Sequence, residues 1–150
     1  MIRGAYEYNY IAGWYTFISL GNKSIEKVVE FIPTGVPNIM SLSFGDLLED
    51  GSIDYNVVSN NGDINKVLAT VIEIVNHFTS QRPEVSIYFK GSTVERTKLY
   101  KRVLKMHYPV FCKSFLIWGL VKMGDNYYEE IPFHPQAAII YFCFLIKRIN

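Results

Sequence analysis

An amphipathic segment over residues 63–78 constrains the fold of this chain most. Its apolar side chains lie within about 160° of arc at roughly 100° per residue, which predicts a helix with one buried face. Asn61 or Asp63 is expected to cap the start of this helix, and Arg82-Pro83 to close the turn that follows. The apolar residues are Ile64, Val67, Leu68, Val71, Ile72, Ile74, Val75 and Phe78.

Strand patterns lie on both sides of this helix. Residues 14–20 and 25–32 alternate polar and apolar side chains around Gly21-Asn22-Lys23-Ser24, which is typical of a β-hairpin. Between the strands and the helix, the acidic residues 47–61 carry turn signals and are expected to form a long surface loop. The other predicted strands are residues 39–44, 85–89, 115–121, 127–131 and 138–147.

A second helix is expected after the strand at residues 85–89. It opens at Ser92 or Thr93 and runs to about His107, and Pro109 is expected to stop it. Strands, helix, strand, helix and strands in this order predict an α+β fold. We expect a mostly antiparallel twisted sheet of about six or seven strands, with two helices packed on one face.

Length and composition place the chain in a broad class. The 150 residues suit a single domain over residues 1–150, and 49% hydrophobic with 19% charged residues excludes a disordered chain. Residues 1–13 do not read as a signal or transit peptide, and the apolar run 137–146 is about half of a membrane span. We therefore expect a cytoplasmic protein with no membrane partner, and buried free thiols at Cys112 and Cys143.

Charge is distributed unevenly along the chain. Residues 28–65 hold six acidic and no basic residues, whereas residues 90–113 hold seven of the fifteen basic residues against one acid, Glu95. Two interpretations remain open: a basic face that binds a polyanion, or two oppositely charged segments that lie together.

The turn between residues 85–89 and the second helix is a candidate anion site. Gly91, Ser92 and Thr93 precede the positive end of a helix, where backbone N–H groups can bind an anion. Ser92 and Glu95 have the spacing of a capping box. The turn lacks the further glycine and lysine of a P-loop and has no GxGxxG pattern, so it is suggestive only.

Arg96 is expected on the apolar face of this second helix. A buried guanidinium at the positive end of a helix needs an anionic partner. The partner is either an acid of the chain, Asp46 or Asp63, in a structural salt bridge, or a phosphate held by the Gly91 turn and the Arg96 fork.

The polar face of the second helix carries a basic surface of Lys98, Lys101, Arg102 and Lys105. Either it is an ordinary solvated face, or it contacts nucleic-acid phosphates or an acidic protein. Neighbouring tyrosines such as Tyr100 and Tyr108 could then stack on bases.

The remaining polar residues do not have the spacing of a known catalytic or metal-binding motif. His77 is expected to pair with Glu73, His107 to lie at a helix end and His134 in a loop, and these spacings predict no metal site and no cofactor. The acids Asp46, Asp50 and Asp54 could bind a divalent cation, but Asp-rich loops are usually only solvated. Whether the chain is an enzyme stays open.

Three motifs together resemble an uncharacterised bacterial domain family of about this length, familiar from Bacteroidota. They are Phe44-Gly45-Asp46, Ser59-Asn60-Asn61-Gly62-Asp63 and Gly91-Ser92-Thr93 with Arg96-Thr97 and Leu99-Tyr100. The resemblance covers nearly the whole chain and is weaker at the C-terminus. It implies a stand-alone protein and no assigned activity.

The favoured hypothesis is a small cytoplasmic protein that binds a phosphate-bearing partner, such as nucleic acid, through residues 91–102. The size of the chain and the host range point to a toxin–antitoxin or phage-defence context. One alternative is a non-catalytic interaction protein that docks a partner or a second copy as a homo-oligomer. The other is an enzyme on a phosphorylated small molecule, with Arg96 clamping the phosphate and Asp46 or Asp63 as base.

Overall fold

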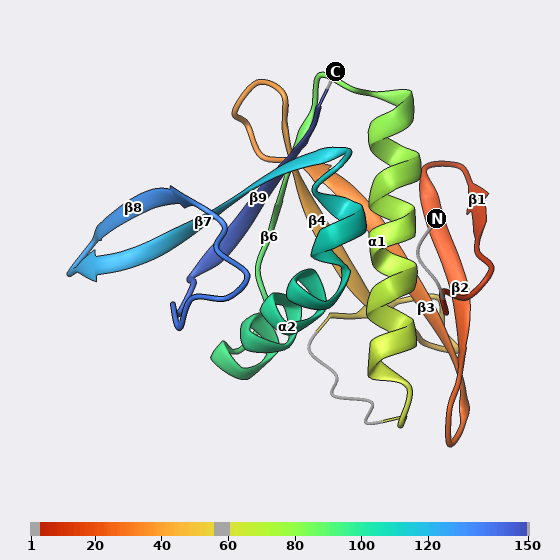
Figure 1. Cartoon of the computed structure of the whole chain (residues 1–150). Coiled ribbons are helices and arrows are strands. Elements are labelled where there is room, and N and C mark those ends of the chain that lie inside the picture. The colour runs from red at the N-terminus through yellow and green to blue at the C-terminus, as the bar shows by residue number, and fades with distance from the viewer. Residues whose placement is uncertain (1–3, 56–60, 150) are drawn as a thin grey trace. The chain divides into compact units, whose positions relative to one another are not determined.

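The computed structural model describes residues 4–55 and 61–149 of the chain (Figure 1). The described part contains two helices and nine mostly antiparallel strands, which confirms the predicted α+β class. It divides into two compact units: the first is Met1–Ile32 with Leu42–Phe78, and the second is Pro33–Ser41 with Thr79–Asn150.

The first unit is built on a β-hairpin, as predicted. Strands β2 and β3 are antiparallel, with Tyr15 opposite Val29 and Leu20 opposite Ser24. In hydrogen-bonding order the strands are β1, β2, β3 and β4, and β5 pairs with β4. Their bounds are β1 Asn9–Ile11, β2 Trp14–Leu20, β3 Ser24–Pro33, β4 Ile39–Leu47 and β5 Ile53–Asp54.

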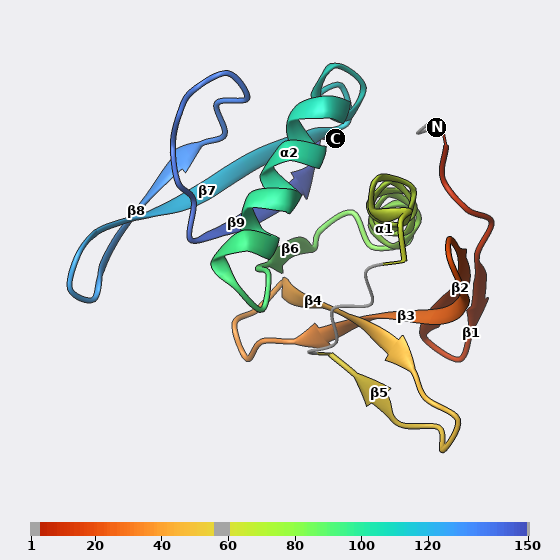
Figure 2. The same ribbon diagram turned by 90° about the horizontal axis from the view of Figure 1, so that it is seen from below.

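Helix α1, Ile64–Gln81, covers the hairpin of the first unit (Figure 2). It is the predicted helix, extended by about one turn at its end. Its buried face meets β2 and β3, because alternate residues of each strand point to the same side. The resulting core contains Tyr15, Phe17, Val29, Val67, Val71 and Ile74.

The second unit contains the remaining strands and α2. The first residues of β4 pair in parallel with β6, with Ile39 opposite Ser86, and the order continues through β9, β7 and β8 in antiparallel pairs. Helix α2 packs on this unit through residues such as Val103, Leu104 and Phe111, which are buried. The bounds are β6 Ser86–Phe89, α2 Val94–Phe111, β7 Phe115–Gly124, β8 Tyr127–Pro132 and β9 Cys143–Arg148.

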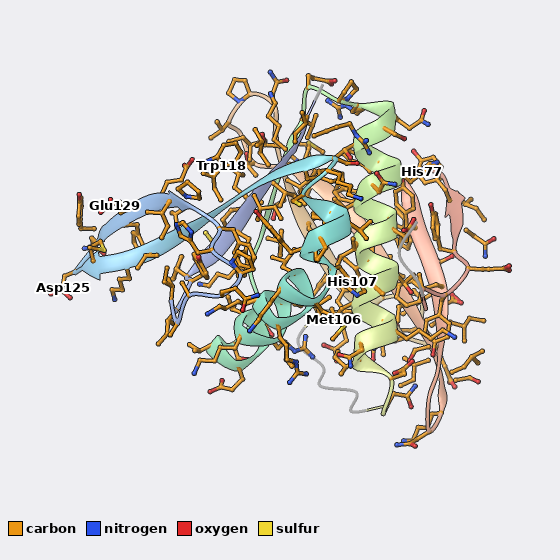
Figure 3. The ribbon with its side chains drawn as sticks, in the orientation of Figure 1. His77, Met106, His107, Trp118, Asp125 and Glu129 are labelled. Carbon is orange, nitrogen blue, oxygen red and sulfur yellow. The ribbon has the colours of Figure 1, made fainter. Side chains whose placement is uncertain are left out.

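Strands β7 and β8 form a hairpin that extends beyond the end of the neighbouring strand β9. Pairing of β7 with β9 ends at Leu120 opposite Cys143, whereas β8 follows β7 to the two-residue turn Asp125-Asn126. Asn126 has a φ of 59°, the left-handed conformation that short hairpin turns require. Asp125 therefore lies at the end of a two-stranded ribbon (Figure 3).

The predicted strand count was too low. The described residues form nine strands, and the two that were missed are β1 and β5, with three and two residues. Such short strands carry too few residues for an alternating pattern to show. Strand β5 interrupts the predicted acidic loop, of which residues 56–60 lie outside the described residues.

Two predicted boundaries near the C-terminus were also wrong. Pro109 does not stop α2, because it removes only its own N–H donor and Cys112 N–H still reaches the Tyr108 carbonyl at 2.9 Å. The predicted strand at 138–147 begins only at Cys143, since the residues before it form an irregular connection. Cys143 is buried as expected, but Cys112 is only half-buried.

Candidate functional site

The turn between β6 and α2 is closed by its own side chains. Gly91 N–H donates to the Thr97 hydroxyl oxygen at 3.0 Å, and that hydroxyl donates to the Thr93 carbonyl at 3.2 Å. Thr97 is buried. The Gly91 N–H that was predicted to face an anion is therefore already satisfied within the chain.

Gly91 is required at this turn by close packing. A Cβ atom on Gly91 would lie 2.5 Å from the Thr97 nitrogen and 2.6 Å from the Arg96 Cβ. Only glycine lets the end of β6 approach the first turn of α2 this closely. The glycine thus has a structural explanation that needs no ligand.

The N-cap of α2 is Thr93, so the predicted capping by Ser92 and Glu95 was wrong by one residue. The Thr93 side-chain oxygen accepts a hydrogen bond from Arg96 N–H at 3.2 Å, and its backbone is extended. This satisfies one of the helix's unpaired N–H groups. Glu95 lies in the first turn, where its charge suits the helix dipole.

Arg96 is half-buried near the start of α2. One turn later lies Tyr100, whose pKa is raised by burial while the Arg96 guanidinium opposes that rise.

Both acids that were considered as partners of Arg96 have partners within the first unit. Asp46 forms a buried ion pair with Lys27, and the exposed fractions of the two side chains are 8% and 5%. The carboxylate of Asp63 accepts hydrogen bonds from the Tyr6 and Ser19 hydroxyls, each at 2.6 Å.

Lys27 is the important residue that the sequence interpretation missed. It lies opposite Phe17 in the hairpin register, on the side of the core residue Val29. Strict alternation from Val29 would have placed Lys27 on the buried face. A buried lysine needs an anion, and that requirement was the available signal.

Three of the four residues in the predicted basic surface are exposed: Lys98, Arg102 and Lys105. Lys101 differs, because its Nζ donates to the carbonyl oxygens of Ala137 at 3.1 Å and Ile139 at 2.6 Å. Lys101 therefore binds the connection before β9 and is not free in solvent. We call the other three residues, Lys98, Arg102 and Lys105, the exposed basic face.

The three histidines occupy separate environments. His77 of α1 lies among Tyr8, Tyr10 and Tyr15, and its Nδ1 is 2.8 Å from the Tyr15 hydroxyl (Figure 3). Burial lowers the pKa of His107, which favours its neutral form. His134 is exposed in the connection before β9.

The predicted acidic residues do not form a metal centre in the described ranges, 4–55 and 61–149. No group of three His, Cys, Asp or Glu residues there is placed to hold a metal ion. Asp50 instead accepts hydrogen bonds from the hydroxyl and backbone N–H of Ser52, which lower its pKa.

The two units carry opposite formal charge. The first holds nine acidic and four basic residues, a net charge of −5, and the second holds eleven basic and five acidic residues, a net charge of +6. The asymmetry along the sequence is thus divided between the two units.

Among the described residues, neither helix is long and apolar enough to cross a membrane. A family of unknown function, DUF6934, matches the chain over residues 4–149. The chain belongs to this family. No curated protein matches it, and no solved structure does. Membership of DUF6934 agrees with the resemblance to an uncharacterised domain family, and it assigns no activity to the exposed basic face.

Proposed function

We propose that this chain binds a phosphate-bearing polyanion, specifically a nucleic acid, through α2. The observation that carries the proposal is the exposed basic face on a unit with a net charge of +6. Such a surface attracts phosphates regardless of base sequence. We place this binder in the cytoplasm and, from its size, in a toxin–antitoxin or phage-defence setting.

The proposal moves the phosphate contacts from the Gly91 turn to the face of the helix. Gly91 N–H is taken by Thr97, so the turn has one donor fewer for an anion. Lys98, Arg102 and Lys105 are separated by three and four residues along α2 and lie on one side of it.

The test is binding of a labelled oligonucleotide by fluorescence anisotropy at several salt concentrations. Three phosphate contacts predict that log affinity falls with log salt concentration with a slope of about −2 to −3. Replacing Lys98, Arg102 and Lys105 by glutamate should abolish binding at low salt without unfolding the protein.

A matched control uses three other exposed lysines. Replacing Lys23, Lys113 and Lys122 by glutamate changes the net charge equally and leaves the exposed basic face intact. This variant should retain most of the binding. Equal loss in both variants, or no binding at low salt, would contradict the proposal.

Self-association is a second candidate function, and the opposite charges of the two units favour it. The acidic first unit of one molecule is a complementary partner for the basic second unit of another. The proposed enzyme activity has no comparable support, because both of its proposed bases have partners in the first unit: Asp46 pairs with Lys27, and Asp63 with two hydroxyls.

A further inference from the structure

A groove of about 440 Å³ lies in the second unit beside the exposed basic face. One wall is Thr97, Lys98 and Lys101 of α2, and the other is residues 138–141 of the connection before β9. Its volume is in the range of small-ligand sites.

The Lys101 ammonium holds the connection against α2. Its two hydrogen bonds, to the Ala137 and Ile139 carbonyls, bracket the residue Ala138 that lines the groove. An ammonium has three N–H donors, and these carbonyls take two of them. This charged contact therefore fixes the two walls of the groove relative to each other.

Tyr141 fixes the other end of the groove wall. It is buried, its hydroxyl accepts a hydrogen bond from His134 N–H at 3.0 Å, and its ring lies 5.3 Å from the Phe144 ring. A Cβ atom on Gly119 would lie 2.1 Å from the Tyr141 ring, so the ring packs directly on the β7 backbone. Because this wall is already fixed, it loses little conformational entropy when a ligand binds.

The chemistry of the groove is apolar inside and cationic at its rim. Ala138, Ile139 and Ile140 supply aliphatic contact, and exposed Lys98 supplies charge beside them. A nucleotide unit has the matching division, because its base is flat with a π face and its phosphate carries the charge.

We propose that this groove takes one unpaired base of a single-stranded nucleic acid while the exposed basic face holds the neighbouring phosphates. This inference rests on the proposed function and makes it specific to single strands. A paired base inside a duplex is stacked and cannot enter a groove of this kind without unstacking. The chain should therefore prefer single strands to duplexes of equal length.

The experiment compares three labelled oligonucleotides of one length at low salt: a single strand, the same strand with abasic sites, and a duplex. Burial of one base against the apolar groove predicts that the intact single strand binds about tenfold tighter than the abasic strand. The duplex, whose bases are paired, should bind more weakly than the intact single strand.

A variant that fills the groove tests whether the preference for the intact single strand arises there. Ala138→Leu adds an uncharged aliphatic side chain at an exposed groove residue and should remove the tenfold preference while leaving salt-dependent binding. Gln136→Leu is the control, because Gln136 is exposed in the same connection but does not line the groove.

The outcomes separate the two proposals. Absence of binding to all three oligonucleotides overturns the proposed function and this inference together. Equal binding to all three leaves the proposed function intact and overturns the inference. A preference that survives Ala138→Leu overturns the groove as the place where the base binds.

Discussion

At the scale of single residues, the clearest constraint is the missing side chain of Gly91. Gly91→Ala places a methyl group against the first-turn backbone of α2, so we expect it to lower the free energy of unfolding by about 1–3 kcal/mol. Gly124→Ala is the control, because nothing lies within 4 Å of its Cβ position, and it should cost less than about 0.5 kcal/mol. Urea denaturation measures both, and equal effects would contradict the packing explanation.

The buried pair of Lys27 and Asp46 gives a second residue-scale prediction. Asp46→Ala removes the carboxylate that pairs with the buried Lys27 ammonium, so we expect a loss of about 3–5 kcal/mol in unfolding free energy. Replacing both residues, with Lys27→Met and Asp46→Leu, should recover most of this loss. The exposed pair of Arg82 and Glu84 is the comparison, since Glu84→Ala should change stability by under about 1 kcal/mol. A small effect of Asp46→Ala alone would show that the pair is not needed.

Tyr15 predicts how stability depends on alkaline pH. Burial raises the pKa of Tyr15 far above its usual value of 10.0, so the folded protein keeps this proton when the unfolded chain has lost it. Stability from this group is therefore present below about pH 10 and is lost as pH rises further. Tyr15→Phe should cost about 1 kcal/mol at neutral pH, because the hydrogen bond to His77 is lost.

Above pH 10, the unfolding free energy of Tyr15→Phe should fall less steeply with pH than that of the parent protein. The difference between the two slopes should be up to about 1.4 kcal/mol per pH unit. Thermal denaturation between pH 8 and pH 11 measures this slope. Exposed Tyr127→Phe is the control and should follow the parent protein. Parallel curves for Tyr15→Phe and the parent would contradict the argument.

At the scale of elements, the start of α2 separates two neighbouring hydroxyl residues. Thr93→Ala removes the N-cap hydrogen bond to Arg96 N–H and should cost about 1 kcal/mol of unfolding free energy. Ser92→Ala should cost less than about 0.5 kcal/mol, because Ser92 is exposed and is not the cap. Loss of stability on the Ser92 change instead would restore the capping box predicted from sequence.

The elements that sequence alone predicted are those with a repeated local pattern. The hairpin of β2 and β3, helix α1 and the strands β7 and β8 each have several turns or alternations. The connection before β9 was misread as a strand, because Ala138 and Ile140 are exposed whereas Tyr141 is buried by its packing on Gly119 of β7. Local patterns carry no information on such long-range contacts.

The candidate site was predictable only in part for the same reason. The exposed positions Lys98, Arg102 and Lys105 follow from helix periodicity. The hydrogen bonds from Lys101 to the Ala137 and Ile139 carbonyls join residues more than thirty positions apart, so no spacing in the sequence predicts them. The pairing of Lys27 with Asp46 likewise depends on strand register.

At the scale of the whole molecule, a formal net charge of +1 conceals units of −5 and +6. If the second candidate function holds, sedimentation velocity at low salt should show species larger than a monomer. These species should dissociate as salt rises, because screening shortens the range of charge attraction to about 10 Å at 0.1 M. Replacing Lys98, Arg102 and Lys105 by glutamate should also dissociate them. A single monomeric species at all salt concentrations would exclude self-association through charge.

The contact between Gly119 and the Tyr141 ring also has an evolutionary consequence. Because a Cβ at position 119 would overlap the ring, a larger residue there requires a smaller side chain at position 141. Among family members, we therefore expect these two positions to vary together, with glycine at 119 wherever an aromatic residue occupies 141. The groove between α2 and the connection before β9 would then be inherited or lost through this pair of positions.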